Sequence, residues 1–383
     1  MSGAQKRIVI AAGGTAGHVV PALAVADALR AEGARVSFIG GGRAEADLVP
    51  GAGFEFHRLA VQGLSRTNPL KALRALLLAA LAVPRARRLL RTLAPDAVMG
   101  GGGYAAGPVG LAALTLRVPL VLTEADSHLG LTNRMLAPFA RRVCLAFPIG
   151  GRAGRRYLLT GRPIAALIED RQGAREHFGI PPELSCVLVF GGSLGARSVN
   201  LAAVEAFGGA PFRVLHVCGR RDYEMLAGRA PAEEPAFDGV REGRPGGYDL
   251  RPYLEREEFA QALAAADLVV GRAGGSVFEL AAHGLPAVLI PYPHASGDHQ
   301  SSNAAWMADG GAAVVIPDGE LTGARLGGEV ASLLADPRRL GAMSAAARRL
   351  ARPEAAREIA GELLRAAGAD PVAGDPPSGE AGT

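Results

Sequence analysis

Four glycine-rich stretches carry the residue types that could bind a phosphate. "RIVIAAGGTAGH" (7–18) and "CVLVFGGSLGA" (186–196) each run from an apolar stretch through glycines toward a helix. "GGGGYAAGP" (100–108) and "GRAGGS" (271–276) follow the apolar runs "DAVM" and "DLVV". A turn without Cβ atoms between a strand and a helix lets backbone N–H groups and the positive helix end face an anion. The four loops predict a site for a diphosphate and sugars between two domains.

The spacing of these glycines disfavours two common nucleotide-binding motifs. "GGTAG" lacks the G-x-G-x-x-G spacing, and "RVSFIGGGR" ends in glycines and Arg43 where an NAD-binding unit has an acidic residue. No glycine loop is followed by Lys and Ser or Thr, as a P-loop requires. The nucleotide is therefore expected to be neither NAD nor the NTP of a P-loop enzyme.

Strand-like and helical runs alternate along the chain, which predicts an α/β fold with parallel sheets covered by helices. The 383 residues suit two Rossmann-like domains. We expect an N-terminal domain over 1–162 and a C-terminal domain over 163–350, with a hinge in 158–168. A helix over 351–367 is expected to pack back on the N-terminal domain, and the Gly- and Pro-rich tail 368–383 is expected to be disordered.

The charge is unevenly distributed. Residues 1–165 hold 21 Lys and Arg against 8 Asp and Glu, and the remainder holds 20 against 29. The N-terminal half should therefore attract anionic partners. Three widely spaced cysteines suggest no disulfide framework, and no apolar run has the length of a membrane span.

Residues 58–95 contain eight Lys and Arg and no acidic residue. Leu70, Leu73, Leu77 and Leu81 fall near one helical stripe with basic residues around them. One interpretation is an anchor on anionic lipid, and the other is a core helix with a solvated basic face. A nucleic-acid-binding module is disfavoured because the basic stretch has no interleaved aromatic residues and no reader motif.

Taken together, these motifs resemble the MurG family of peripheral transferases in glycosyltransferase family 28. The resemblance rests on the glycine loops with "EADLVP", "LGLTNRMLA" and "HGLPAVLIPYPHASGDHQSSNA", in order over residues 7–366. It implies a GT-B fold, with the acceptor bound by the N-terminal domain and the UDP-sugar by the C-terminal domain. The implied reaction transfers N-acetylglucosamine from UDP-GlcNAc to the C4 hydroxyl of lipid I. A related transferase acting on another lipid, such as diacylglycerol, is the alternative.

The resemblance also implies partners and a location. The partners are UDP-N-acetylglucosamine, lipid I and an anionic membrane surface, with contacts to other cell-wall synthesis proteins and none to nucleic acid. The location is the cytoplasmic face of the cell membrane, and the membrane contacts fall on Leu73, Leu77, Leu81, Arg85 and Arg88. No metal is required, although Mg²⁺ on the diphosphate is compatible with the sequence, which has no Asp-x-Asp motif.

The C-terminal motifs imply donor-binding roles. The donor diphosphate is assigned to Ser193, Leu194, Gly195, Arg272 and Gly274. Glu279 matches a glutamate that binds ribose hydroxyls, and His299 and Gln300 match residues that bind the transferred sugar. Leu254 and Phe259 are assigned to the uracil pocket.

The N-terminal motifs imply acceptor-binding and catalytic roles. His18 matches the loop histidine of the family. In "TEADSHLGLTN" (123–133), Glu124 matches the family pattern, whereas Thr123, Ala125 and Asp126 depart from it. The catalytic residues are assigned as His18, Asp126 and Glu124. Either His18 or Asp126 is expected to be the base, because both can accept a proton. In "TGRPIAA", Arg162 is expected to substitute for a cation missing at Ala165. The acceptor and its diphosphate are assigned to Gly14, Thr15, Ala16, Gly17, Gly102, Gly103, Tyr104, Asn133 and Arg162.

Overall fold

The computed structural model describes residues 5–14, 16–61, 69–164, 167–192, 195–229 and 247–368. The chain forms two compact units. Unit 1 comprises residues 1–163 and 354–383, and unit 2 comprises residues 164–353.

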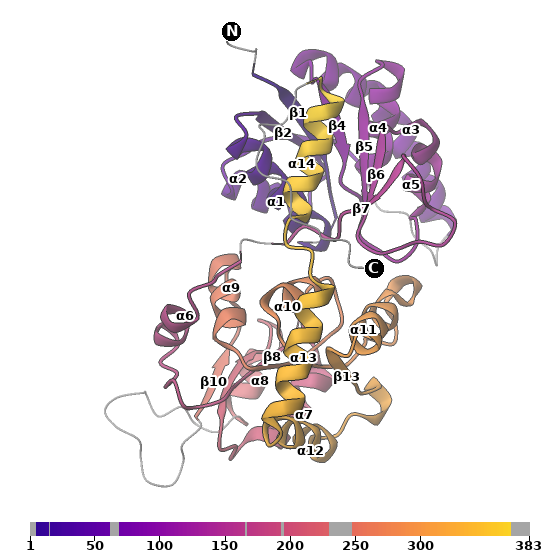
Figure 1. Ribbon diagram of the computed structural model, residues 1–383. Helices are drawn as coiled ribbons and strands as arrows, with labels where there is room; N and C mark the ends of the chain where they lie inside the picture. Colours follow the sequence, from indigo (N-terminus) through magenta and orange to yellow (C-terminus); the bar gives the residue numbers. More distant parts are fainter. Residues whose placement is uncertain are drawn as a thin grey trace. The chain divides into compact units, whose positions relative to one another are not determined.

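Unit 1 is a doubly wound α/β structure with a seven-stranded parallel sheet in the order β3-β2-β1-β4-β5-β6-β7 (Figure 1). Its strands are β1 (Arg7–Ala11), β2 (Arg35–Gly40), β3 (Glu55–Arg58), β4 (Ala97–Gly100), β5 (Leu120–Glu124), β6 (Arg142–Leu145) and β7 (Tyr157–Leu159). Its helices are α1 (Ala16–Ala31), α2 (Glu45–Gly51), α3 (Pro69–Leu93), α4 (Ala106–Thr115), α5 (Leu131–Leu136), the 3₁₀ turn η1 (Ala137–Phe139) and α14 (Ala355–Ala366).

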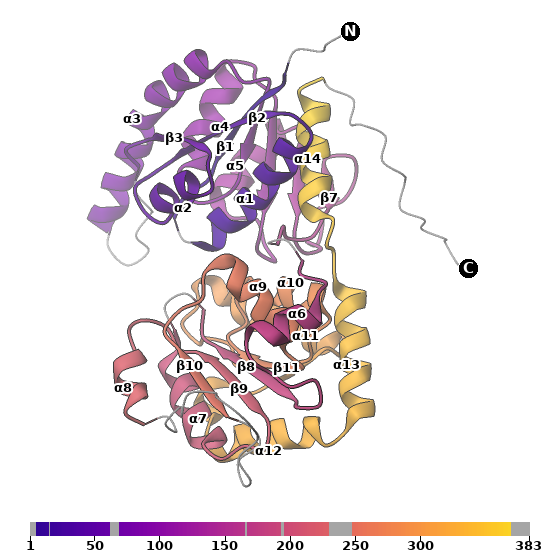
Figure 2. The ribbon, with the colours of Figure 1, turned by 90° about the vertical axis from the view of Figure 1, so that its left-hand side faces the viewer.

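The strands of this sheet bury both faces because successive side chains point to opposite sides. Ile8 and Ile10 of β1 pack in one core with α1 and α14, whereas Val9 and Ala11 pack in the other core with α3, α4 and α5. Ile359 and Leu363 of α14 are almost fully buried in the first core, and α14 lies beside α1 (Figure 2). The C-terminal helix is therefore an integral part of unit 1.

Unit 2 has a six-stranded parallel sheet in the order β10-β9-β8-β11-β12-β13. Its strands are β8 (Cys186–Phe190), β9 (Arg213–Val217), β10 (Tyr248–Arg251), β11 (Leu268–Gly271), β12 (Ala287–Leu289) and β13 (Ala313–Val315). Its helices are α6 (Arg171–His177), α7 (Arg197–Phe207), α8 (Tyr223–Ala227), α9 (Arg256–Ala265), α10 (Val277–His283), α11 (His299–Asp309), α12 (Gly323–Leu334) and α13 (Pro337–Leu350), with 3₁₀ turns η2 (Ser296–Asp298) and η3 (Asp318–Glu320). Helices α7 and α12 cover one face, and α9 and α10 lie on the other (Figure 2).

The strand order reverses at the same point in both sheets, between β1 and β4 and between β8 and β11. Ligands of open α/β sheets bind at such switch points, outside the carboxyl ends of the strands. All four predicted glycine loops follow these four strands, which confirms the placement expected from the sequence. The candidate site residues of each unit are therefore sought at this edge.

Candidate functional site

The two glycine loops of unit 1 pack directly on each other. Gly103 has φ +74°, and a Cβ on it would lie 1.8 Å from the carbonyl oxygen of Gly13. Gly102 has φ +88°, and its Cβ would lie 2.8 Å from Cδ2 of His18. Both positions favour glycine, because a side chain would strain a backbone with positive φ and would lie too close to its neighbours. The β4 loop thus forms the support on which the β1 loop and the His18 imidazole rest.

A buried carboxylate, which the sequence analysis did not single out, joins these loops. Glu45 is completely inaccessible to solvent. Its Oε2 accepts the N–H of Gly14 at 3.0 Å, and its Oε1 accepts the N–H of Gly41 at 2.9 Å and the hydroxyl of Tyr104 at 2.8 Å. Burial raises the pKa of the Glu45 carboxyl, but these hydrogen bonds outweigh it and the net pKa is lowered. The motif "EADLVP" was the available signal for this residue.

The contacts of Glu45 correct the predicted role of Gly14. The Gly14 N–H was expected to help bind the acceptor diphosphate, but it already donates to the carboxylate. The N–H groups in the first turn of α1, which have no acceptor within the helix itself, remain the part of this loop suited to an anion. Thr15, also assigned to this role, lies outside the described residues.

We expect Glu45→Gln to destabilise the protein and to weaken acceptor binding. An amide cannot accept all three hydrogen bonds, so at least one buried donor loses its partner at a cost of about 1–3 kcal/mol. Because the pKa of Glu45 is lowered from 4.5, its contribution to stability is present above pH 4.5 and is lost as the pH falls below that value. Denaturant unfolding at several pH values should show a flatter acid limb in the variant. An unchanged free energy of unfolding at neutral pH would contradict this role.

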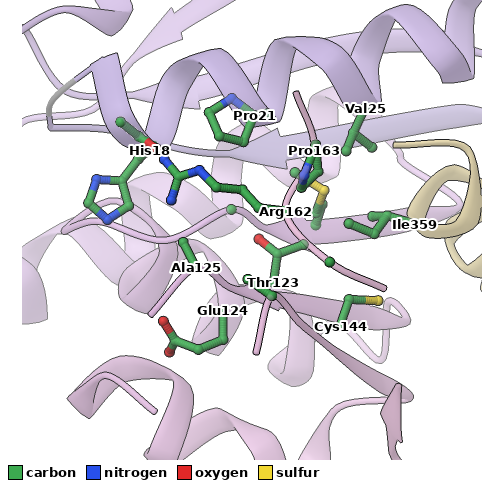
Figure 3. A pocket seen from close by; sticks show the side chains of 16 residues that line it. His18, Pro21, Val25, Thr123, Glu124, Ala125, Cys144, Arg162, Pro163 and Ile359 are labelled. Atoms are coloured by element: carbon green, nitrogen blue, oxygen red, sulfur yellow. Dashed lines mark hydrogen bonds between the residues drawn. The ribbon is translucent and has the colours of Figure 1, made fainter. Parts of the chain in front are cut away.

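A small pocket opens beside the β1 loop, within unit 1 (Figure 3). Its volume is about 20 Å³, which is enough for about one water molecule. His18 and Arg162 lie on one side, and Thr123, Glu124 and Ala125 lie on the other (Figure 3). The Arg162 guanidinium donates to the carbonyl oxygen of Gly17. The structure thus brings together His18, Arg162 and the β5 end, as the sequence predicted.

Glu124 organises the loop that follows β5. It is 7% exposed, and its carboxylate accepts the N–H groups of Asp126 at 3.2 Å and Gly130 at 2.8 Å and the side-chain amide of Asn133 at 2.9 Å. Burial raises the pKa of the Glu124 carboxyl, although these hydrogen bonds oppose the shift. Glu124 and Asn133 were assigned to catalysis and acceptor binding, but the Glu124 carboxylate and the Asn133 amide nitrogen are used inside the loop, and only the buried Asn133 Oδ1 has no hydrogen-bond partner among the described residues. Their contacts support positioning roles.

Asp126 differs from Glu124 in its surroundings. Its side chain is half-buried, and no hydrogen bond or ion pair joins its carboxylate to the described residues. Its backbone N–H is fixed by Glu124. The carboxylate is therefore available to an incoming group, and its role as a base stays a prediction beside that of His18.

The first glycine loop of unit 2 is held against β9. Gly195 has φ +73°, and a Cβ on it would lie 2.2 Å from the carbonyl oxygen of Cys218. The same carbonyl accepts the amide of Asn200, in the second turn of α7, at 2.8 Å. Ser193, Leu194 and Ala165 lie outside the described residues. Gly195 and the start of α7 nevertheless lie at the carboxyl end of β8, where a diphosphate was predicted.

Behind this loop lies a buried polar network. His216 is fully buried, with Nδ1 2.7 Å from the Tyr248 hydroxyl and Nε2 3.1 Å from Oδ1 of Asn200. Asn200 also donates to Asp222 at 3.2 Å, and Asp222 accepts from Arg197 at 2.9 Å. Burial lowers the pKa of His216 to about 3, so its imidazole is neutral at physiological pH. No local motif marks this network in the sequence, because its members are spread over α7, β9, β10 and the turn before α8.

Arg272 lies directly after β11 and is buried in contacts within unit 2. Its guanidinium donates to Asp318 at 2.7 Å, to Ser198 at 2.8 Å and to the carbonyl oxygens of Ile290 and Pro291 at 3.1 and 3.2 Å. Asp318 balances its charge. These contacts do not support its predicted role of adding charge to the donor phosphates. They indicate that Arg272 braces the loops after β11 and β12.

The other predicted donor residues lie at or near the same edge of the sheet. Gly274 follows β11, and its carbonyl oxygen accepts the buried amide of Asn303 at 3.3 Å. Glu279 is half-buried on α10, and His299 and Gln300 begin α11. Gln300 already accepts the N–H of Tyr292 through Oε1 at 2.9 Å, which leaves its amide nitrogen for a ligand. Their roles with the sugar nucleotide stay predictions.

Leu254 and Phe259 follow β10, and the structure places both in apolar surroundings. Leu254 is 4% exposed. Phe259 is half-buried and its ring lies 5.1 Å from that of Phe190, at the end of β8. The Phe259 ring is therefore at the right edge of the sheet for a base pocket, whereas Leu254 contributes mainly to the core.

Comparison with solved structures gives the class of protein. The crystal structure of Acinetobacter baumannii MurG matches with a TM-score of 0.72 and 30% identity, covering 94% of this chain and 99% of that chain. The glycosyltransferase of kitacinnamycin matches in fold with a TM-score of 0.69 and 18% identity, covering 95% of this chain and 100% of that chain. Two doubly wound parallel units with glycine loops at their switch points are the GT-B fold of glycosyltransferases, as predicted.

Sequence comparison identifies the family. The N-terminal domain of glycosyltransferase family 28 matches residues 8–145, and its C-terminal domain matches residues 186–359. The UDP-N-acetylglucosamine–N-acetylmuramyl-(pentapeptide) pyrophosphoryl-undecaprenol N-acetylglucosamine transferase of Moorella thermoacetica is 44% identical over 94% of this chain and 98% of its own length. The enzyme of the same name from Methylococcus capsulatus is 41% identical over 95% and 99%. The chain belongs to glycosyltransferase family 28, and within it to the MurG family.

Proposed function

We propose that this enzyme transfers N-acetylglucosamine from UDP-N-acetylglucosamine to the C4 hydroxyl of undecaprenyl-diphosphate-linked N-acetylmuramyl-pentapeptide, forming lipid II for peptidoglycan synthesis. The observation that carries the proposal is the 44% identity over nearly the whole chain to a transferase named for this reaction. The separate glycine-loop edges of the two units agree with one unit for each substrate.

The proposed chemistry is a single displacement with inversion. The acceptor hydroxyl attacks the anomeric carbon, the bond from that carbon to the UDP oxygen breaks, and the base receives the hydroxyl proton. We assign the base to His18, because its imidazole lines the pocket and rests on the glycines of the β4 loop. The first N–H groups of α7 are suited to stabilise the charge of the leaving diphosphate.

A protein-bound metal is not part of this proposal. The described residues contain no group of three or more His, Cys, Asp or Glu side chains that could hold a metal ion. The developing charge is assigned instead to helix N-termini, with Mg²⁺ on the diphosphate as an optional addition. Transfer measured in EDTA tests this assignment, and a complete loss that Mg²⁺ restores would overturn it.

We further propose that unit 1 binds the cytoplasmic face of the membrane through the helices on one face of its sheet. Leu77 and Leu81 of α3 are 58% and 61% exposed, and Phe139 is 68% exposed. Leu111, Leu131 and Met135, on α4 and α5, are also exposed. The exposed side of α3 carries four residues at helical spacing: Leu77, Leu81, Arg85 and Arg88. Its buried side carries Ala82, Ala86 and Leu90.

An apolar stripe that continues into a basic one suits the boundary of an anionic bilayer. Arg85, Arg87, Arg88 and Arg91 line a shallow basic groove on α3. The side chain of Leu73, also predicted to contact lipid, lies outside the described residues. Among the residues that the structure describes, no helix has the length and apolar content needed to span a bilayer.

We expect Arg85→Glu, Arg87→Glu and Arg88→Glu, combined in one protein, to weaken binding to anionic vesicles by roughly a hundred-fold. Each arginine near such a surface contributes about 1 kcal/mol. Co-sedimentation with phosphatidylglycerol vesicles at two salt concentrations measures the effect. The same charge change at Arg338, Arg349 and Arg352, which are exposed elsewhere, is the matched control. Equal losses in both triple variants, or binding that does not respond to salt, would contradict the proposal.

The experiment that tests the function uses labelled UDP-N-acetylglucosamine with the lipid-linked muramyl-pentapeptide. Label in the lipid phase is expected. The alternative, a transferase acting on another lipid, predicts instead that diacylglycerol is labelled from UDP-glucose while the muramyl acceptor is not.

A further inference from the structure

Two arginines lie beside the glycine loop that follows β2. A Cβ on Gly42 would lie 2.4 Å from Nη2 of Arg58, and a Cβ on Gly41 would lie 2.6 Å from Cε2 of Tyr104. Arg43 lies in the same loop, with Cζ 5.7 Å from the centroid of the Tyr104 ring. The glycines after β2 therefore seat an aromatic ring and a guanidinium against the backbone.

Among the residues that the structure describes, no acidic side chain pairs with either of these two arginines. Both side chains are exposed, and neither forms an ion pair with an acidic side chain in the part of the chain described here. Glu45, the nearest carboxylate in sequence to Arg43, is buried and its hydrogen bonds come from Gly14, Gly41 and Tyr104. Arginine pairs with carboxylate and phosphate groups in a bidentate geometry, so two guanidiniums without an acidic partner, one in the loop after β2 and one at the end of neighbouring β3, favour such a ligand.

Tyr104 supports the arginines without binding the anion itself. Its hydroxyl donates to Glu45 at 2.8 Å, and burial together with this hydrogen bond raises its pKa, so it keeps its proton. The hydroxyl therefore has no proton to give to an anion. The ring offers a π-face within cation–π range of Arg43, and Glu45 fixes its orientation.

The location connects these groups to the proposed acceptor site. Arg58 is the last residue of β3 and pairs with Gly40, the last residue of β2. Strand β2 in turn pairs with β1, which leads to the His18 loop. Neighbouring strands are about 4.8 Å apart, so the end of β3 lies about 10 Å from the end of β1. An acceptor whose hydroxyl meets His18 can place a charged group at that distance.

We propose that Arg43 and Arg58, seated on Tyr104 and the Gly41–Gly42 backbone, form a subsite that binds an anionic group of the acceptor, either phosphate or carboxylate. The subsite rests on the proposed function, which supplies an acceptor with both kinds of group. It explains why the second strand ends in glycines and an arginine in place of an acidic residue.

The test measures steady-state transfer by the wild type, by the double variant Arg43→Gln/Arg58→Gln and by Arg35→Gln. Arg35 is exposed at the opposite end of β2 and serves as the matched loss of charge. The double variant is expected to raise the KM for the lipid-linked muramyl-pentapeptide by about ten-fold or more, because it removes charge-assisted hydrogen bonds. The KM for UDP-N-acetylglucosamine and the values for Arg35→Gln should stay at the wild-type level.

A second acceptor, with the peptide carboxylates amidated, distinguishes the two anions. If the ligand is a carboxylate, amidation raises the wild-type KM and the double variant adds no further increase. If the ligand is a phosphate, the double variant weakens both acceptors equally. Transfer by the wild type together with an unchanged acceptor KM in the double variant would overturn the subsite alone. Absence of transfer by the wild type would overturn the proposed function and the subsite with it.

Discussion

His18→Gln is expected to lower kcat by about 10²- to 10⁴-fold, the usual contribution of a positioned general base. Glutamine keeps a polar side chain of similar reach but cannot take the proton of the acceptor hydroxyl. The imidazole packs against Gly102, where a Cβ would lie 2.8 Å from its Cδ2. Steady-state kinetics with both substrates should show a loss in kcat with a small change in the donor KM.

Asp126→Asn is the matched comparison, because Asp126 has the other available basic group near this pocket. It preserves the shape of the side chain and the backbone hydrogen bond to Glu124. We expect a loss of less than about ten-fold from this variant, since it removes charge but not the assigned base. A loss larger in Asp126→Asn than in His18→Gln would move the base to Asp126. Unfolding curves of both variants check that the fold is intact.

The central strands of both sheets were predictable from sequence, whereas three edge strands have no clear strand pattern. β1, β4, β8 and β11 are apolar runs buried on both faces and followed by glycines, which is a strong signal. β3, β7 and β10 are the outer strands of their sheets and have three or four residues each. Their mixed composition, as in "EFHR" and "YDLR", resembles that of loops because one side of an edge strand has no partner.

The candidate site was predictable where one local motif carries it, and not where distant residues meet. The glycine loops, His18 and Arg162 were singled out because each lies in a short motif that is contiguous in the sequence. Glu45 was missed because its three donors come from the loops after β1, β2 and β4, which only the strand order brings together. Arg272 was assigned to phosphate because its motif shows the charge but not Asp318, which balances it 46 residues later.

Acidification is expected to destabilise the protein steeply through His216. The Asn200 amide nitrogen donates to the Cys218 carbonyl oxygen and to Asp222, so the Asn200 Oδ1 faces His216 as an acceptor. The proton of the neutral His216 ring therefore lies on Nε2, and Nδ1 accepts from the Tyr248 hydroxyl. Both ring nitrogens are therefore satisfied in the neutral form. Burial lowers the pKa of the folded form to about 3 from an ordinary value of 6.5.

As the pH falls from 6.5 to about 3, the unfolded chain gains a proton at this position that the folded chain does not bind. The contribution to the free energy of unfolding falls by about 1.4 kcal/mol per pH unit in this window and is constant above it. We expect His216→Gln to be less stable than the wild type at pH 7, because the network loses hydrogen bonds, but to lose stability more slowly on acidification.

Denaturant unfolding from pH 7 to pH 4 measures this slope, and His177→Gln, at an exposed position at the end of α6, is the matched control. Parallel curves for the wild type and His216→Gln would show that another group causes the acid transition.

The Asn200 amide donates to the Cys218 carbonyl oxygen, and Gly195 packs against the same carbonyl. Protonation of His216 should therefore also loosen the glycine loop after β8. The affinity for UDP should then fall over the same pH window in the wild type and change less in His216→Gln.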